Sequence, residues 1–174
     1  MTAPHPGPLK RKDALLTRER LVRAALDLFT AQGYRATTTL EIAARARIAE
    51  ATIYRHFPGK EALFNEACRQ ALQWGIALVK SGERGNGSVR ERLHRIARAL
   101  VEQVPKDRAL VVMLLRRPDG APVEEPTAHV AREFREGLAQ LIAAGKQEGA
   151  IRAGSADLWA AVWLALMGFV VERV

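Results

Sequence analysis

The sequence has few of the features that mark secreted, membrane-spanning or β-sheet proteins. Its single cysteine, Cys68, excludes an intrachain disulfide and suits a reducing compartment. The longest uncharged apolar run, Leu158–Val171, is shorter than the roughly twenty residues that a membrane-spanning helix needs. The first residues, MTAPHPGP, lack the apolar core of a signal peptide. We therefore expect a soluble cytoplasmic protein with no membrane partner.

The recurrent patterns of enzymes and metal sites are also scarce. There is no glycine-rich phosphate loop and no paired-carboxylate pattern. Glu125, His129 and Glu133 share one helical face, which a metal could use, but a solvated charged face is the commoner origin of such spacing. Cys68 could pair with a histidine as a nucleophile, yet it lies on an apolar stripe, where cysteine acts as a small hydrophobic residue. We expect no catalytic residue, no metal and no cofactor.

Basic residues, by contrast, are abundant and unevenly distributed. A hydrophobic fraction of 48% with 26% charged residues is typical of a folded globular protein. The net charge is +8, and residues 1–60 hold eleven Lys or Arg against five Asp or Glu, while residues 61–174 hold sixteen against fourteen. This excess near the N-terminus points to a polyanionic partner, although a basic surface kept for solubility has a similar composition.

Hydrophobic residues recur with the period of a helix and no stretch alternates like a strand, so we expect an all-α fold. Residues 1–16 are expected to form a flexible, proline-rich and basic tail. A first helix is expected over 18–32, with Thr17 as its N-cap and Gly33 at its end. Later helices are expected over 60–80, around 93–104, from Pro105, around 130–142, and from Ser155 or Asp157 to the end of the chain.

The stretch Thr37–Leu63 has the pattern of two short helices joined by a tight turn and followed by a third. Thr38 and Glu41 have the spacing of a capping box. The second short helix, over 50–57, would bury Ile53 and leave a polar face open, and Pro58-Gly59 would end it. A helix pair of this kind is the shape that enters the major groove of DNA.

Spaced residues within this stretch carry a family resemblance: Gly33, Thr37, Thr38, Ile42, Ala43, Ala46, Ile48, Thr52, Ile53, Tyr54, His56, Phe57, Lys60, Glu61, Ala62 and Leu63. Together they resemble the DNA-binding signature of the tetracycline-repressor (TetR) family. The sequence departs from that signature at Arg47, where glycine is usual, and at Ala49, where serine or threonine is usual. Arg47 is then expected to adopt a backbone conformation that glycine accepts more easily, and the helix after Ala49 to lack a side-chain cap.

The resemblance implies an N-terminal three-helix helix-turn-helix DNA-binding domain over 17–60 and a C-terminal helical ligand-binding and dimerisation domain over 61–174. It implies a transcriptional regulator, more often a repressor in this family, that a small-molecule inducer releases from a palindromic operator in double-stranded DNA. The implied DNA-binding residues are Thr38, Arg47, Glu50, Ala51, Thr52, Tyr54, Arg55, His56 and Lys60. Arg55 is expected to read a base, with a phosphate contact as the open alternative. Tyr54, His56, Lys60 and Thr38 are expected to bind phosphate, and Leu40 to offer an apolar contact.

The resemblance also implies an apolar ligand pocket among the C-terminal helices. Its tentative ligand-binding residues, each of which is otherwise plain core, are Trp74, Met113, Phe134, Trp159, Trp163 and Met167. The last helix is apolar all round, so we expect a homodimer in which a second copy covers one face. Family members usually have one more helix there, which leaves open a shorter interface, an incomplete chain or a weaker dimer. The alternative function is a basic helical module that binds a protein or a membrane without reading DNA sequence.

Overall fold

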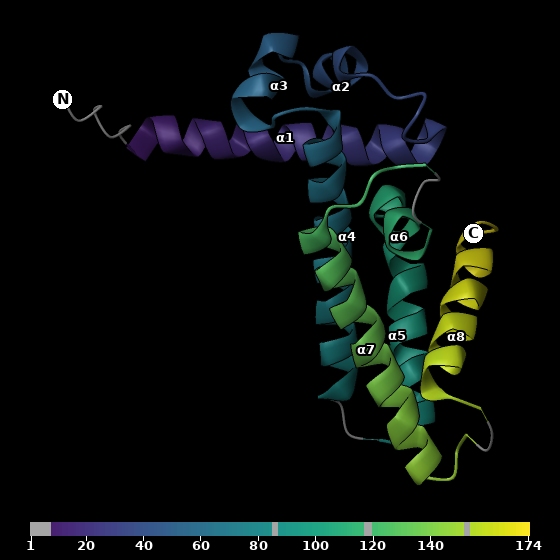
Figure 1. Cartoon of the computed structure of the whole chain (residues 1–174). Helices are drawn as coiled ribbons and strands as arrows, with labels where there is room; N and C mark the ends of the chain where they lie inside the picture. Colours follow the sequence, from purple (N-terminus) through teal and green to yellow (C-terminus); the bar gives the residue numbers. More distant parts are fainter. Residues whose placement is uncertain (1–7, 85–86, 117–119, 152–153) are drawn as a thin grey trace.

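A computed structural model of the chain describes residues 8–84, 87–116, 120–151 and 154–174. These residues contain helices and no strand, which confirms the all-α fold class (Figure 1). The helices are α1 (Pro8–Gln32), α2 (Thr39–Ala46), α3 (Glu50–His56), α4 (Lys60–Glu83), α5 (Val89–Gln103), α6 (Arg108–Leu115), α7 (Glu125–Gln147) and α8 (Ala156–Val171). Within the described residues, no helix combines the length and the hydrophobicity needed to cross a membrane.

Helices α1, α2 and α3 pack together at one end of the molecule, with α2 and α3 on the same side of α1 (Figure 1). Leu21, Val22 and Phe29 of α1 are fully buried, as are Ile42 of α2 and Ile53 of α3. Full burial of such a side chain stabilises by about 1.5–3 kcal/mol relative to exposure. This packing holds α2 and α3, which are too short to be stable alone.

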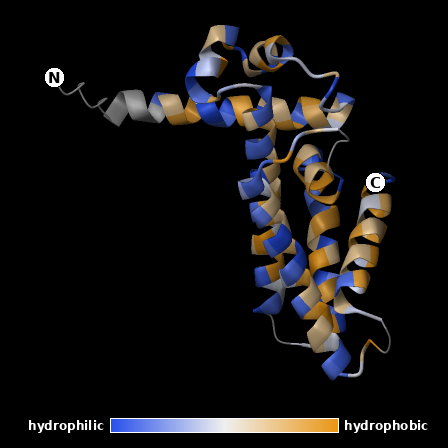
Figure 2. Ribbon diagram, viewed as in Figure 1, coloured by the Kyte–Doolittle hydropathy of each residue, from blue (hydrophilic) through white to orange (hydrophobic). Residues whose placement is uncertain are grey.

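Helix α4 begins beside α1 and runs away from it into a bundle with α5, α6, α7 and α8 (Figure 1). Near its start, the Phe64 ring meets the rings of Phe29 and Tyr34 edge to face, with centroid distances of 5.3 and 5.1 Å. Further along, a Cβ at Gly75 would lie 2.6 Å from Leu114 Cδ1, so the glycine permits the close approach of α6 to α4. Figure 2 shows hydrophobic residues concentrated in α6 and α8, and hydrophilic residues along the outer sides of α4 and α7.

The start of α1 differs from the expectation. The helix begins at Pro8, so residues 8–16 are helical rather than a flexible tail, and residues 1–7 of the expected tail lie outside the described residues. Proline suits a first helical turn because its missing N–H has no partner there. Thr17 is not an N-cap: its hydroxyl donates to the Asp13 carbonyl oxygen within the helix at 2.8 Å.

Three other helix ends also differ from the expected positions or decide between expected alternatives. Helix α6 begins at Arg108 rather than Pro105, because an Asp107 carboxylate oxygen accepts from the Leu110 N–H at 2.9 Å. Ser155, not Asp157, caps α8, its hydroxyl accepting from the Leu158 N–H at 3.0 Å. Helix α4 continues to Glu83, three residues beyond the expected end at Lys80.

Candidate nucleic-acid interface and ligand cavity

The turn between α2 and α3 has the backbone geometry that the sequence predicts. Arg47 has φ 57° and ψ 49°, which lies in the left-handed region where glycine is less strained. Ala49 precedes α3 without a side-chain cap. Arg20 of α1 donates to the carbonyl oxygens of Ala46 and Arg47, the second at 3.2 Å. Hydrogen bonds from α1 therefore stabilise a turn that has a left-handed arginine and no side-chain cap for the helix that follows.

The predicted capping box is confirmed at the start of α2. The Thr38 hydroxyl accepts from the Glu41 N–H at 3.2 Å, and the Glu41 carboxylate accepts from the Thr38 N–H at 2.8 Å. The backbone hydrogen bond from Thr38, followed by that from its hydroxyl, lowers the pKa of Glu41. Thr38 remains exposed, so the cap fixes the side chain without covering it.

Helix α3 presents the face that the sequence predicts. Ile53 is fully buried and Phe57, the C-cap, is 4% exposed. The residues expected to contact DNA from this helix are exposed or half-buried: Glu50, Ala51, Thr52, Tyr54, Arg55 and His56. Glu50 is also engaged within the protein, because its carboxylate accepts from the Thr39 hydroxyl at 2.7 Å. This bond ties the start of α3 to the start of α2, while Tyr54 and Arg55 stay open to solvent.

Lys60 was expected to bind phosphate, but its ammonium makes its contacts within the protein. Its ammonium donates to the carbonyl oxygens of Tyr34 and Thr37, at 3.0 and 2.8 Å, and lies 4.4 Å from the centre of the Tyr34 ring. An ammonium has three donors, so most of its capacity is used inside the protein. Lys60 therefore fastens the connection between α1 and α2 to the start of α4.

A chain of polar contacts from the end of α3 to α7 was not foreseen from the sequence. The Arg18 guanidinium lies 4.9 Å from the centre of the Phe57 ring and donates to Glu66 of α4 at 2.8 Å. Glu66 also accepts from Arg69 at 2.7 Å, and Arg69 donates to the Thr127 hydroxyl of α7 at 2.9 Å. The hydrogen bond from Arg18, reinforced by Arg69 and opposed by burial, lowers the pKa of Glu66.

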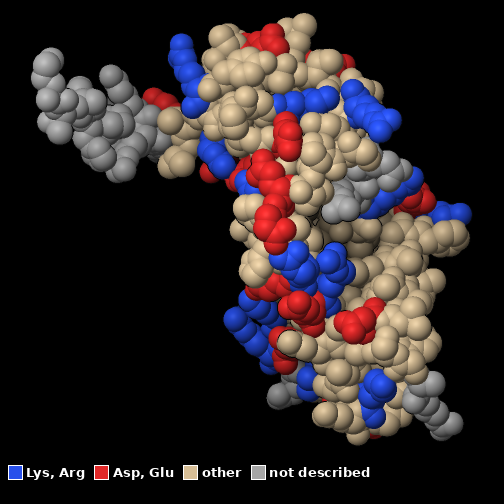
Figure 3. Space-filling model, viewed as in Figure 1, with Lys and Arg blue, Asp and Glu red and all other residues tan. Residues whose placement is uncertain are grey.

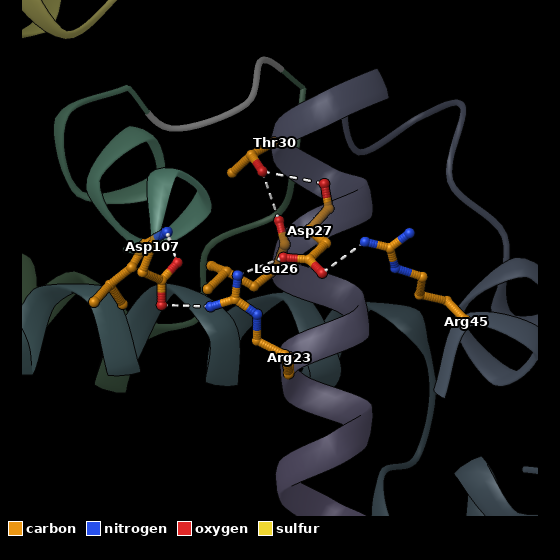
Figure 4. Close-up of polar contacts among 7 residues, drawn as sticks. Arg23, Leu26, Asp27, Thr30, Arg45 and Asp107 are labelled. Atoms are coloured by element: carbon orange, nitrogen blue, oxygen red, sulfur yellow. Dashed lines mark hydrogen bonds and ion pairs between the residues drawn. The ribbon is translucent and has the colours of Figure 1, made fainter. Parts of the chain in front are cut away.

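A second chain of charged groups crosses α1 (Figure 4). Arg23 bonds to Asp107, the N-cap of α6, and pairs with Asp27 at 2.8 Å. The other carboxylate oxygen of Asp27 accepts from Arg45 of α2 at 3.0 Å. Helices α6, α1 and α2 are thus linked by adjacent ion pairs. No spacing marks this chain in the sequence, because Arg23 and Asp107 lie on different helices.

A cavity of about 210 Å³, partly open to solvent, lies between α4, α6, α7 and α8. Its lining comprises Cys68, Leu72, Met113, Leu114, Leu115, Thr127, Ala131, Phe134, Arg135 and Leu164. The cavity therefore brings together Met113 and Phe134 from the tentative ligand-binding set. Trp74, Trp163 and Met167 pack against the core instead, and Trp159 is 40% exposed on α8. Cys68 is buried, as its place on an apolar stripe predicts.

Helix α8 has an apolar stripe that faces outward, formed by Leu158, Val162, Leu166 and Phe169. These side chains are between 38% and 59% exposed. On the face shown in Figure 3, charged side chains crowd the surface over α4 and α7, whereas the surface over α8 is mostly uncharged. A contiguous apolar patch on a soluble protein marks an interaction surface.

The carboxylates of α7 considered for a metal site are used in ion pairs. Glu125 pairs with Arg132, and Glu133 pairs with Lys80 at 3.4 Å. In the part of the chain that the structure describes, no three His, Cys, Asp or Glu side chains are grouped to hold a metal ion.

Comparison with known proteins places the helix-turn-helix in a family. The family model for bacterial regulatory proteins of the tetR family matches residues 21–67, which contain α2, the Arg47 turn and α3. The similarity extends beyond this segment: the chain is 28% identical over 163 residues to the uncharacterized HTH-type transcriptional regulator YvkB of Bacillus subtilis, covering 91% of this chain and 83% of that protein. The chain belongs to the TetR family.

Other TetR-family relatives match over much of the chain. The HTH-type transcriptional regulator TcmR of Streptomyces glaucescens is 32% identical over 147 residues, or 79% of this chain and 64% of TcmR. The crystal structure of a gamma-butyrolactone receptor, an ArpA-like protein, has a TM-score of 0.77 and 26% identity, covering 92% of this chain and 84% of the other. The structure of AibR with isovaleryl coenzyme A and operator DNA has a TM-score of 0.74 over 90% of this chain and 86% of AibR, and at 21% identity it shows a shared fold alone.

Since the family and these relatives are transcriptional regulators, this TetR-family chain is a DNA-binding transcriptional regulator and not an enzyme. The reading as a basic helical module without sequence-specific DNA binding is accordingly set aside.

Proposed function

We propose that this TetR-family protein is a cytoplasmic homodimeric repressor that leaves a palindromic operator when a small organic molecule binds. The observation that carries the proposal is the placement of α3, which packs on α2: Ile53 is fully buried, while Tyr54 and Arg55 face solvent. A short helix supported in this way can enter a major groove with its polar side against the bases.

Within α3, Arg55 is proposed to read a base. Residues around it are proposed to bind phosphates and so to position the helix in the groove. Arginine can donate two hydrogen bonds to guanine, a contact worth about 1–3 kcal/mol of discrimination. Thr38, Arg47, Tyr54 and His56 are proposed to contact phosphates, which fix register without reading sequence. Glu50, Ala51 and Thr52 complete the proposed base-facing surface, and Leu40 is exposed on α2 where it can meet a thymine methyl group.

The division into residues 17–60 for DNA binding and 61–174 for regulation and dimerisation remains part of the proposal. The exposed stripe of α8 is proposed to pack against the same stripe of a second copy, because a two-fold axis makes one patch complementary to itself. Two α3 helices related by that axis would reach successive major grooves about 34 Å apart, which requires an inverted-repeat operator.

For the ligand, the cavity beside Met113 and Phe134 is the proposed inducer site. Its volume of about 210 Å³ lies below the roughly 300–1,000 Å³ of most ligand sites, so the proposed inducer is a molecule smaller than most site ligands. The similarity to a structure named as a gamma-butyrolactone receptor supports an organic ligand of modest size, without identifying it.

Selection of bound DNA from a random pool tests the proposal. The expected result is a consensus with two inverted half-sites, and binding that weakens steeply as salt concentration rises. Substituting Arg55→Ala should reduce the preference for this consensus over a single-base mismatch by about 5- to 150-fold, the equivalent of one lost bidentate base contact. Arg90→Ala, which replaces an exposed arginine of α5, is the charge-matched control. Recovery of no consensus, or an unchanged preference in Arg55→Ala, would contradict the assignment.

A further inference from the structure

A second and larger hollow lies where the DNA-binding helices meet the bundle. This junction cleft has a volume of about 620 Å³ and is walled by the end of α1, the connection to α2, α6 and the end of α8. It is separate from the 210 Å³ cavity described above, with Leu115 as the residue that lines both. Its volume falls within the roughly 300–1,000 Å³ typical of sites for small organic ligands.

The apolar part of the junction cleft comes from residues of three helices. Phe29 of α1 and Val171 of α8 are buried, and Val112 of α6 is half-buried. Gly168 of α8 leaves space, because a Cβ there would meet only the Leu115 Cβ, at 4.0 Å. These surfaces can cover the hydrocarbon part of a ligand.

The polar part of the junction cleft is cationic. Arg35 and Arg108 line it, are exposed, and have no carboxylate partner among the residues that the structure describes. The third arginine of the lining, Arg116, is paired with Glu172 at 2.7 Å. Within the described residues, the guanidinium groups of Arg35 and Arg108 have no ion-pair partner and lie beside an apolar wall. A guanidinium binds a carboxylate or sulfonate through two parallel hydrogen bonds.

The position of the junction cleft separates it from the DNA-reading surface. Helices α2 and α3 lie on one side of α1, while α6 and α8 lie on the other (Figure 1). DNA bound along α3 would therefore leave the cleft open to a small molecule. From this combination we infer that the junction cleft is a binding site for an organic anion with an apolar body.

The junction cleft is also connected to the DNA-binding helices. Helix α6, which forms one of its walls, is capped at its N-terminus by Asp107, and Asp107 bonds to Arg23 of α1 (Figure 4). Arg23 pairs with Asp27, which holds Arg45 of α2. An anion that draws Arg108 toward Arg35 would shift the start of α6 and this chain of ion pairs. The binding of such an anion should therefore weaken operator binding, a consequence that rests on the proposed function.

Two fluorescent dyes that differ by one charge test the site on the full chain. The probe is 8-anilino-1-naphthalenesulfonate, and its neutral match is N-phenyl-1-naphthylamine, which lacks the sulfonate. In the variant Arg35→Ala/Arg108→Ala, the Kd of the sulfonate dye should rise by about tenfold or more, since two charge-assisted contacts are lost. The Kd of the neutral dye should stay within twofold. The variant Arg90→Ala/Arg95→Ala removes the same charge from α5 and should leave both values unchanged.

A second variant tests whether the dyes occupy the junction cleft, without changing the charge of the protein. Gly168→Leu would place a side chain in the junction cleft, and it should weaken both dyes while thermal unfolding stays cooperative. Unchanged sulfonate-dye binding in the Arg35→Ala/Arg108→Ala protein would overturn the site, as would equal weakening of both dyes in that variant. Dye binding that persists fully in Gly168→Leu would overturn it too, because the dyes would then lie elsewhere, such as on α8.

The coupling is tested separately with the selected operator. The sulfonate dye should lower the affinity for DNA by about fivefold or more, and DNA should lower the dye's affinity by the same factor. Correct dye binding with no change in DNA affinity would overturn the coupling and leave the site standing. If the protein bound no DNA sequence selectively, the proposed function would fail while the dye measurements would still decide the site.

Discussion

At the scale of single residues, the most informative position is Arg47. A residue other than glycine in the left-handed region costs about 1–2 kcal/mol relative to ordinary helical geometry. Here Arg20 of α1 donates to the carbonyl oxygens of Ala46 and Arg47, and these hydrogen bonds help to hold the turn in this conformation. Arg47, which stands where glycine is usual in the family, is exposed, and its guanidinium is proposed to contribute to phosphate binding.

We predict that Arg47→Gly stabilises the protein by about 1 kcal/mol relative to Arg47→Ala, because both remove the charge and only glycine relieves the backbone. Urea unfolding of the two variants measures this difference. Both variants should bind operator DNA more weakly than the natural sequence, by a similar factor, since the lost phosphate contact is common to them. Equal stabilities of the two variants would mean that the turn is unstrained.

At the scale of the helices, the sequence was most informative where structure is local. The capping box at Thr38, the absent cap at Ala49 and the left-handed residue at Arg47 depend on near neighbours, so a pattern of a few residues predicts them. The start of α1 was misplaced because Thr17 has the composition of a cap, and only the intact helix shows its hydroxyl bonded to Asp13. The inward turn of Lys60 and the chain from Arg18 to Thr127 depend on contacts between distant segments, and no periodicity encodes them.

The contact between α1 and α4 gives a prediction about pH. The pKa of Glu66 is lowered in the folded protein, chiefly by Arg18, so its contribution to stability is present above the ordinary value of 4.5. That contribution is lost as pH falls through the lowered pKa, because the native state must then take up a proton. Glu66→Gln should lower the free energy of unfolding by about 1–2 kcal/mol at pH 7, and by progressively less below pH 4.5.

Urea unfolding from pH 7 to pH 3 provides the measurement, and Glu102→Gln on α5 is the matched control. Glu102 pairs with Arg98, but both side chains are more than 60% exposed, so its substitution should change stability by less than about 0.5 kcal/mol. A Glu66→Gln protein with an unaltered pH profile would show that the Arg18 contact contributes nothing to stability.

At the scale of the whole molecule, the outward stripe of α8 is the surface through which we propose that two copies associate. We predict that Leu166→Glu disrupts the dimer, because it would bury a carboxylate without a partner at the centre of the stripe. Sedimentation velocity should then show a monomer. Operator affinity should fall by a factor of about one hundred or more, since the two half-sites would no longer be bound together.

Gln73→Glu on α4 adds the same charge at an exposed position and should leave both association state and affinity unchanged. A Leu166→Glu protein that remains a dimer would place the interface on another surface.

The anchoring of Lys60 has a consequence for genetics. A screen for loss of repression should recover substitutions of this lysine and suggest a nucleotide contact, although its ammonium is bonded to the carbonyl oxygens of Tyr34 and Thr37. The slope of operator affinity against salt concentration separates the two explanations. If Lys60 binds a phosphate, Lys60→Met should reduce that slope by about one. If Lys60 acts only through its hydrogen bonds to Tyr34 and Thr37, the substitution should weaken operator binding and leave the slope unchanged. Mutations collected at this position would then report how strongly the helix-turn-helix is attached to α4, and not which nucleotides the protein contacts.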